Sequence, residues 1–380
     1  MSKIEELIER LCPNGVEYKK LDEVCNFNRG TSMTSKNAIE GDVPVISGGQ
    51  KPAFYHNASN RPAGTITIAG SGAYAGYVAF WDKPIFCADS FSVDVKDDKI
   101  LDKKFLCYYL LNKQQDIYNK KTGAGIAHVH GKDIAKFKIP VPPLEVQCEI
   151  VHILDDFTLL SAELSAELKA RKRQYEYYKN KIFNNKNVKY MRLEEIGQVK
   201  MCKRILKKQT NSISGIPFYK IGTFGKEPDA YISEETYKDY LKKYNHPKKG
   251  DILISCAGTI GRTVVYDGKP AYFQDSNIVW LEHDESIVLN KYLLYSYSLN
   301  PWNISNGGTI ARLYNDNILK AVIPVPTIED QIKIIKVLDN FDKICNSLMD
   351  GLPAEIEARQ KQYEYYRDKL LTFKELKVNE

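Results

Sequence analysis

Three short clusters of residues could in principle perform chemistry. His128-Val129-His130 could bind a metal ion, Asp97-Asp98-Lys99 resembles the D-x-K of nucleases, and Gly70-Ser71-Gly72 with Gly76 resembles a nucleotide loop. Each also has a simpler interpretation: solvated or structural histidines, a charged surface turn and a glycine-rich β-turn. The sequence contains no G-x-x-x-x-G-K-[ST] phosphate loop and no Asn/Asp-Pro-Pro-aromatic tetrapeptide of aminomethyltransferases. We therefore expect no catalytic residues, no metal site and no cofactor in this chain.

The chain consists of two copies of one unit, divided near residue 186. Residues 139–147 read I-P-V-P-x-x-E-x-Q, and the same pattern returns at residues 323–331. Further matches occur in the same order in both halves: 64–68 with 250–254, 154–157 with 338–341, and 174–178 with 362–366. Such self-similarity indicates a duplicated architecture.

The repeat changes how the chemical candidates are interpreted. At the places of His128 and His130 the second copy has Arg312 and Tyr314, which are not metal ligands. Histidine and arginine can both donate hydrogen bonds to bases or phosphates, so this position suits a DNA-binding surface. The glycine loop after residue 69 corresponds to residues 256–261, and it can be either a structural turn or a backbone donor to DNA phosphate. The predicted DNA-binding residues are Lys51, Tyr74, His128, His130, Lys132, Lys220, Thr223, Lys226, Thr259, Arg262, Arg312 and Tyr314.

Charge and composition narrow the class of protein. Of a net charge of +6, residues 169–208 contribute +11, so the remainder sums to −5. This basic centre favours a polyanionic partner, although a solvated helix face would give the same pattern. No apolar run reaches the ~18 residues of a membrane-spanning helix. Eight scattered cysteines without a C-x-x-C spacing argue against a disulfide scaffold or a Cys-rich zinc site and favour the cytoplasm.

Each copy is expected to have a globular part followed by a long helix. β-type runs at 43–46, 65–69, 77–81 and 91–95, with a helix at 103–119, predict an α+β domain. The expected fold class is α+β, with two pseudo-symmetric globular domains joined by two long antiparallel coiled-coil helices. The predicted boundaries are 1–143 and 187–327 for the domains, and 144–186 and 328–375 for the helices.

The helices carry apolar residues at alternating spacings of four and three, which predicts a heptad seam between them. The expected helix-pair core is Leu154, Phe157, Leu164, Leu168, Tyr175, Tyr178, Leu338, Phe341, Leu348, Tyr363 and Tyr366. Tyr177 and Tyr365 point off the seam. Together with Arg171 and Arg359 they could be solvated or could contact another subunit.

Equivalent residues of the two copies lie 184 positions apart up to Phe341 and 188 positions apart from Ala358 onward. The second helix therefore contains four more residues than the first. A four-residue insertion disturbs a heptad seam, and a proline inside a helix removes a backbone hydrogen bond. The insertion includes Gly351 and Pro353, so the second helix is predicted to kink or break at 351–353.

These motifs together resemble the DNA-specificity subunits of type I restriction-modification systems. The resemblance is carried by the two I-P-V-P-x-x-E-x-Q helix starts, two A-R-x-x-Q-Y-E-Y-Y helix ends and G-D-I-L-I-S-x-x-G-T-x-G at 250–261. It covers nearly the whole chain, although the first copy departs from the last motif, with Thr65 in place of the aspartate.

The resemblance implies that each globular domain is a target recognition domain for one half of a bipartite DNA site. It further implies that the helices space the two halves and dock two modification subunits, which bind S-adenosylmethionine and methylate adenine. Restriction subunits that use ATP and Mg²⁺ would join this core. A tandem Ser-Ala-Glu-Leu at 161–168 suits an adjustable spacer, or two turns of an ordinary helix. A self-contained DNA methyltransferase or nuclease fragment and a two-headed scaffold that does not bind DNA are the alternative classes.

Overall fold

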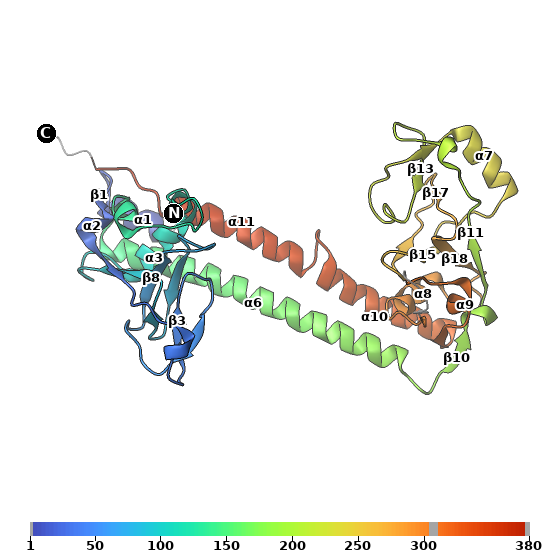
Figure 1. Ribbon diagram of the computed structural model, residues 1–380, viewed down its shortest axis with the longest axis horizontal. Helices are drawn as coiled ribbons and strands as arrows, with labels where there is room; N and C mark the ends of the chain where they lie inside the picture. Colours follow the sequence, from blue (N-terminus) through green and yellow to red (C-terminus); the bar gives the residue numbers. More distant parts are fainter. Residues whose placement is uncertain (1–2, 304–310, 377–380) are drawn as a thin grey trace. The chain divides into compact units, whose positions relative to one another are not determined.

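The computed structural model describes residues 3–303 and 311–376 and divides into two compact units (Figure 1). Unit 1 is formed by the described residues of Met1–Ser165 and Glu355–Glu380, and unit 2 is Ala166–Ala354. Both units contain helices and sheets. None of the helices in the described ranges is long and apolar enough to cross a membrane.

Unit 1 contains a four-stranded sheet, a three-stranded sheet and a two-stranded ribbon. Its strands are β1 (Glu17–Lys20), β2 (Cys25–Arg29), β3 (Val43–Ile46), β4 (Phe54–His56), β5 (Thr65–Ala69), β6 (Val78–Trp81), β7 (Phe86–Cys87), β8 (Ser90–Val95) and β9 (Lys138–Val141). Its helices are α1 (Lys3–Leu11), α2 (Leu21–Val24), η1 (Ser35–Asn37), α3 (Lys103–Asn112), α4 (Gln114–Tyr118) and α5 (Gly131–Ile134), with parts of α6 (Leu144–Phe183) and α11 (Leu352–Leu370).

Unit 2 repeats this plan and completes α6. Its strands are β10 (Lys189–Arg192), β11 (Gln198–Met201), β12 (Thr210–Asn211), β13 (Ile216–Tyr219), β14 (Tyr231–Ile232), β15 (Ile252–Ser255), β16 (Thr263–Val265), β17 (Tyr272–Phe273), β18 (Ile278–Glu282) and β19 (Val322–Val325). Its helices are η2 (Leu193–Glu195), η3 (Lys207–Gln209), α7 (Glu234–Lys243), α8 (Asn290–Tyr297), α9 (Asn315–Leu319) and α10 (Ile328–Asn346).

Strand order shows that the sequence repeat is a structural repeat. The main antiparallel sheet runs β2-β8-β5-β6 in unit 1 and β11-β18-β15-β16 in unit 2. The ribbon pairs β1 with β9 in one unit and β10 with β19 in the other. A parallel pair, β3 with β7 and β13 with β17, recurs as well. The predicted α+β repeat is therefore confirmed, whereas α7 has no counterpart among the described residues of unit 1.

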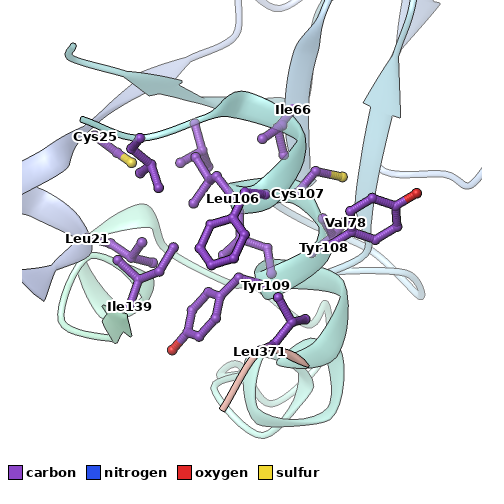
Figure 2. Close-up of a cluster of buried hydrophobic side chains, with 14 of the residues drawn as sticks. Leu21, Cys25, Ile66, Val78, Leu106, Cys107, Tyr108, Tyr109, Ile139 and Leu371 are labelled. Atoms are coloured by element: carbon purple, nitrogen blue, oxygen red, sulfur yellow. The ribbon is translucent and has the colours of Figure 1, made fainter. Parts of the chain in front are cut away.

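The middle strands β5 and β15 are covered on both faces, which explains why they contain only apolar residues and the small hydroxyl residues Thr65, Thr67 and Ser255. Every residue of β5 and of β15 is buried. In unit 1 the covering helix is α3, whose Leu106 and Tyr109 face Ile66 and Ile139 in one cluster, and Leu371 closes that cluster (Figure 2). The predicted strands at 43–46 and 65–69 match β3 and β5, and the predicted helix at 103–119 is divided into α3 and α4.

Each long helix carries in its first turn a buried glutamine from the I-P-V-P-x-x-E-x-Q motif. Gln147 is fully buried, donates from Nε2 to the carbonyl oxygens of Ile100 (2.8 Å) and Pro142 (2.7 Å), and accepts from the Asp102 backbone N–H (2.8 Å). In unit 2, Gln331 makes the same three kinds of bond. Its Nε2 donates to the carbonyl oxygens of Ile287 and Pro326, and its Oε1 accepts from the Leu289 N–H. Both glutamines thus join the helix start to the loop before α3 or α8.

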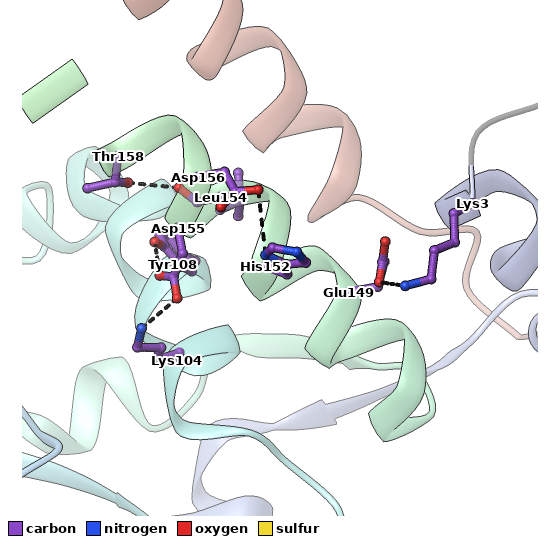
Figure 3. Close-up of polar contacts among 9 residues, drawn as sticks. All are labelled: Lys3, Lys104, Tyr108, Glu149, His152, Leu154, Asp155, Asp156 and Thr158. Atoms are coloured by element: carbon purple, nitrogen blue, oxygen red, sulfur yellow. Dashed lines mark hydrogen bonds and ion pairs between the residues drawn. The ribbon is translucent and has the colours of Figure 1, made fainter. Parts of the chain in front are cut away.

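An aspartate two turns further along makes a second joint between helix and domain. Asp155 accepts from the Tyr108 hydroxyl (2.7 Å) and pairs with Lys104 (2.5 Å), as Figure 3 shows. Asp339 has the same partners in unit 2, Tyr295 (2.5 Å) and Lys291 (2.8 Å). Burial, followed by the bond to Asp155, raises the pKa of Tyr108, so this hydroxyl donates as a neutral phenol.

Within each unit the expected seam residues of the two helices meet in part. In unit 1 Phe157 contacts Tyr363 and Tyr366, with ring centroids 6.3 and 5.6 Å apart. In unit 2 Phe341 contacts Tyr175 and Tyr178, at 5.9 Å in both cases. The remaining seam residues differ in burial: Leu154, Leu164 and Leu338 are buried, and Leu168 is half-buried.

The predicted interruption of the second helix is confirmed, slightly before its expected place. α10 ends at Asn346 and α11 begins at Leu352, so residues 347–351 separate them (Figure 1). Pro353 lies in the first turn of α11, where a missing N–H costs no helical hydrogen bond. Assigning Leu348 to the helix-pair core was wrong, because it lies in this interruption and its side chain is 75% exposed.

The glutamine joints generate a stability prediction. Gln147→Leu leaves three buried backbone groups without a partner, so we expect opening of unit 1 to become easier by about 2–4 kcal/mol. Hydrogen exchange should accelerate in residues 99–110 but not in 286–297, and Gln331→Leu should give the opposite pattern. Cys148→Ser, at the neighbouring exposed position, is the control. Unchanged exchange at 99–110 in the Gln147 variant would contradict this role.

Candidate nucleic-acid interface

A glycine-rich loop follows the central strand of each main sheet and contacts the segment that carries the candidate readout residues. In unit 1 the Val129 N–H donates to the Gly70 carbonyl oxygen (3.0 Å). In unit 2 the Leu313 N–H donates to the Cys256 carbonyl oxygen (2.9 Å). His128 and Arg312, each one residue before these donors, therefore occupy equivalent positions, as the repeat predicted.

In unit 1 the loop borders a groove with an imidazole pair. His128 and His130 are exposed, and their parallel rings lie 6.3 Å apart. Lys132 follows in α5, and Arg29, at the end of β2, lines the same groove. The groove thus presents hydrogen-bond donors from two elements, the arrangement expected for contacts to phosphates or base edges.

The other two candidates of unit 1 lie on neighbouring loops. Tyr74 belongs to the glycine loop itself and is 46% exposed. Lys51 follows a turn that approaches the loop closely, since a Cβ on Gly48 would lie 2.3 Å from the Ser71 carbonyl oxygen. Neither side chain lines the groove that contains His128.

In unit 2 the glycine loop holds the turn at 220–226. Arg262 donates from Nη1 to the Phe224 carbonyl oxygen (2.8 Å), which fixes this turn against the loop. Thr223 caps the turn by accepting from the Lys220 N–H (3.1 Å), while the Lys220 ammonium pairs with Asp229 (2.8 Å). Lys226 and Thr259 are exposed. Arg262 consequently has a structural bond in addition to any contact with a ligand.

Arg312 and Tyr314 flank Leu313, whose N–H donates to Cys256 of the same loop. Arg312 donates from Nη2 to the Ser276 carbonyl oxygen (2.8 Å), and its guanidinium carbon lies 6.0 Å from the centroid of the Tyr314 ring. Tyr314 is 56% exposed. The guanidinium is held in place by one bond, and its remaining N–H groups can donate to a ligand.

A segment that the sequence reasoning missed connects these parts of unit 2. The Ile221 N–H donates to the Gln274 side chain (2.9 Å), Arg204 pairs with Asp275 (2.8 Å), and Arg312 bonds to Ser276. Ser276 has φ of +58°, a conformation that costs energy for a residue other than glycine. We call residues 274–276 the connecting segment.

The equivalent aspartate of unit 1 was missed as well. Asp89 follows β7 as Asp275 follows β17, and it is exposed in the groove with His128 and Arg29. The Asp-Ser dipeptide that recurs at 89–90 and 275–276 was an available sequence signal. Arg29 had no such signal, because only folding brings the end of β2 to the groove.

The helix residues proposed as a subunit interface form the same surface twice. Arg171 donates to Gln174 and Arg359 to Gln362, both at 3.1 Å. Tyr177 is 61% and Tyr365 64% exposed. Each lies edge-on to the next tyrosine, with centroids 5.4 Å apart. One surface presented twice is suited to two copies of one partner.

The described residues contain no cluster of three or more histidine, cysteine or acidic side chains that could hold a metal ion. His128 and His130 instead face a groove with cationic neighbours. Both units present exposed hydrogen-bond donors at these loops, which suits contacts with an anion.

Comparison with known proteins places this chain in one family. The model of the type I restriction modification DNA specificity domain matches residues 13–171 and 185–358. A putative type I restriction enzyme specificity subunit of Haemophilus influenzae is 44% identical over 97% of this chain and 98% of its own length. The EcoR124I/EcoR124II specificity subunit of Escherichia coli is 34% identical over 62% of this chain and 63% of its own length.

Solved structures agree on the fold. The S subunit of a type I restriction-modification system from M. genitalium has a TM-score of 0.60 at 17% identity, covering 94% of this chain and 96% of that one. The HsdS subunit of Thermoanaerobacter tengcongensis has a TM-score of 0.55 at 18% identity, covering 95% and 97%. At these identities the likeness concerns the fold alone.

The glycine loop of unit 2 generates a testable prediction. Gly261 has φ of +77°, and an added Cβ would lie 2.8 Å from Asn300 Oδ1 and from Trp302 Nε1. Gly261→Ala should therefore destabilise unit 2 by about 1–3 kcal/mol, through strain at a left-handed backbone position together with this clash.

Gly222→Ala is the matched control, because a Cβ there meets no atom within 4 Å. Urea unfolding followed by tryptophan fluorescence measures both variants. Equal unfolding midpoints for the two alanine variants would show that Gly261 is not required for the stability of unit 2.

Proposed function

This chain belongs to the type I restriction-modification DNA specificity family, and we propose that each of its two globular domains reads one half of a bipartite DNA target. As a specificity subunit it is the non-catalytic, DNA-recognising component of the system. The proposed recognition domains are residues 1–143 and 187–327. The proposed spacer helices are residues 144–186 and 328–375.

One observation carries this proposal: the same loop frame occurs twice with different side chains around it. The bond from Val129 to Gly70 and the bond from Leu313 to Cys256 are equivalent, yet the flanking residues are His128 in one unit and Arg312 in the other. A shared frame suits a shared mode of docking on DNA, and different side chains suit different base sequences. The proposed contact residues are the twelve DNA-binding candidates together with Arg29.

The proposed partners are double-stranded DNA, two modification subunits and restriction subunits. Arg171 with Tyr177, and Arg359 with Tyr365, would bind one modification subunit each, because the two surfaces have the same internal contacts. S-adenosylmethionine, ATP and Mg²⁺ would be bound by those partner subunits. The proposed location is the cytoplasm, which suits eight free cysteines.

The experiment that tests the function is mapping of methylated bases in cells that express this chain with its modification subunits. The turns beside the two glycine loops differ, Ser47-Gly48-Gly49-Gln50-Lys51 against Lys220-Ile221-Gly222-Thr223-Phe224. We expect an asymmetric motif of two different short words and a non-specific gap. A palindromic motif, or no methylation that depends on this chain, would contradict the proposal.

Arg312 provides a test at one residue. Arg312→Ala should weaken binding of the assembled complex to cognate duplex by about 1–3 kcal/mol, if the guanidinium binds a base through two hydrogen bonds. Assembly with modification subunits should be unaffected. Arg192→Ala, which removes an exposed arginine paired with Glu194 in the same unit, should leave affinity unchanged. Equal affinities of both variants at physiological salt would show that Arg312 does not contact DNA.

The tandem Ser-Ala-Glu-Leu gives a prediction about spacing. Residues 161–168 lie inside α6, and a third copy would rotate one helix end by a net ~40° and lengthen it by ~6 Å. One base pair of B-DNA turns about 34–36° and rises ~3.4 Å, so the rotation matches one step. We expect insertion after Leu168 to keep both words and to lengthen the gap by one base pair.

Methylome mapping of the insertion variant measures this change. Ser161→Ala with Ser165→Ala, which keeps the helix length, is the control and should leave the gap unchanged. An unaltered gap in the insertion variant, or altered words, would show that this segment does not set the spacing.

A further inference from the structure

A basic pocket lies in unit 2 beside the candidate interface, and it contains none of the predicted DNA-binding residues. Its cations come from the loop after β11 and from the last turn of α7. The residues that line it are Met201, Cys202, Lys203, Arg204, Lys242, Lys243, Tyr244, Asn245 and Asp275. We call Lys203, Arg204, Lys242 and Lys243 the α7 clamp, and all four are exposed.

Positive charge in the α7 clamp exceeds the nearby negative charge. Arg204 pairs with Asp275 at 2.8 Å, and Lys243 pairs with Asp239 at 2.6 Å. Within the described part of the chain, Lys203 and Lys242 have no carboxylate partner. The Lys203 ammonium instead lies 5.3 Å from the centroid of the Tyr244 ring. Cations that gather without matching anions repel one another and attract a polyanion.

The dipole of α7 explains only half of this cluster. Lys242 and Lys243 stand in the last turn of α7, where cations are favourable. Lys203 and Arg204 belong to a different segment, so no helix dipole accounts for their position. Their presence beside α7 is a consequence of tertiary structure.

Tyrosines hold the two segments of the pocket together. The Lys203 N–H donates to the Tyr272 hydroxyl (3.1 Å), and the Tyr272 and Tyr240 rings meet edge-on at 5.9 Å. Tyr240 in turn accepts from Gln209 (3.1 Å) and contacts Tyr244 at 5.1 Å. The β11–β12 loop and α7 are therefore joined by a continuous set of contacts.

The connecting segment makes the pocket continuous with the candidate interface. Asp275 binds Arg204 of the α7 clamp, while the neighbouring Ser276 binds Arg312. A DNA strand that contacts Arg312 would therefore have the α7 clamp close by. α7 has no counterpart among the described residues of unit 1, so this feature belongs to one domain only.

We propose that the α7 clamp binds backbone phosphates flanking the half-site that unit 2 reads. This inference rests on the proposed function and adds a contact that does not depend on base sequence. Lysine ammonium groups act on phosphates as point charges, whereas base selection requires directed hydrogen bonds in a groove. The contact is made at one half-site, so the two halves differ in their electrostatic contribution to affinity.

The test is the salt dependence of DNA binding by the full-length chain assembled with its modification subunits. The variant is Lys203→Gln with Lys242→Gln, since both lysines are exposed and neither has an ion pair with a residue of 3–303 or 311–376. The matched control is Lys189→Gln with Lys336→Gln, which removes two exposed lysines of the same unit, on β10 and α10, that do not line the pocket. Binding is measured for cognate and non-cognate duplexes between 50 and 200 mM salt, roughly the range over which phosphate contacts dominate affinity.

We expect the slope of log affinity against log salt to fall by about 1.8, or roughly 0.9 for each lost phosphate contact. Cognate and non-cognate affinities should fall by the same factor, and the control should match the wild type. Ethylation interference should lose signal at phosphates beside the half-site of unit 2 and keep it beside the other half-site.

The outcomes separate this inference from the proposed function. If the wild-type complex does not bind DNA, the proposed function fails. If it binds and the lysine variant has the wild-type slope, the α7 clamp is not a phosphate contact and only this inference fails. Loss of cognate affinity alone would assign base reading to these lysines. Stabilisation of the wild type by inorganic phosphate, with an unchanged DNA slope, would assign the pocket to a free anion. Each of these last three results overturns the inference.

Discussion

A buried amide at the start of each long helix is the interaction on which the geometry of this protein depends. Gln147 and Gln331 are fully buried, and each satisfies three backbone groups that belong to the domain and to the end of the preceding strand. A buried amide is stable only when its donors and acceptor are paired, so the direction in which the helix leaves the domain is fixed. The aspartates at 155 and 339 fix the helix again two turns later. Because the joint is made twice, each domain is attached to its helix in the same way.

Within each unit, the joints attach the helix to the domain, and separate loops carry the candidate DNA contacts. The joints use residues of the repeated motifs and face the core, whereas most candidate DNA contacts lie on the loops after β5 and β15 and on the segments that border these loops. A loop can change its side chains without disturbing a sheet whose central strand is buried on both faces. This separation explains how His128 and Arg312 can occupy one position of a common frame while offering different donors to a base pair.

Much of the fold could be predicted because its signals are local or repeated. β3 and β5 follow from short apolar runs between glycines and prolines, α6 follows from heptad spacing, and the break before α11 follows from a change of offset between the copies. The place of the break was less accurate, because Pro353 fits the first turn of a helix and the interruption formed upstream of it. Leu348 was wrongly assigned for the same reason, since a heptad position has no meaning once the helix has ended.

The candidate site was harder to predict because its parts come from distant segments. Arg29 reaches the groove only through the pairing of β2 with β8, and the connecting segment at 274–276 joins three loops by bonds that no spacing reveals.

The α7 insertion shows why a duplicated chain need not act symmetrically. Its tyrosine contacts join α7 to the β11–β12 loop and bring the four cations of the α7 clamp together on unit 2, whereas α7 has no counterpart among the described residues of unit 1. Electrostatic attraction acts over roughly a Debye length, about 8–10 Å at physiological salt, and before any base is contacted. The proposed clamp would therefore add to unit 2 an attraction to DNA phosphates that does not depend on base sequence. Such a difference in surface charge requires no difference in the joints or sheets, which is consistent with two units that share a frame and differ at the surface.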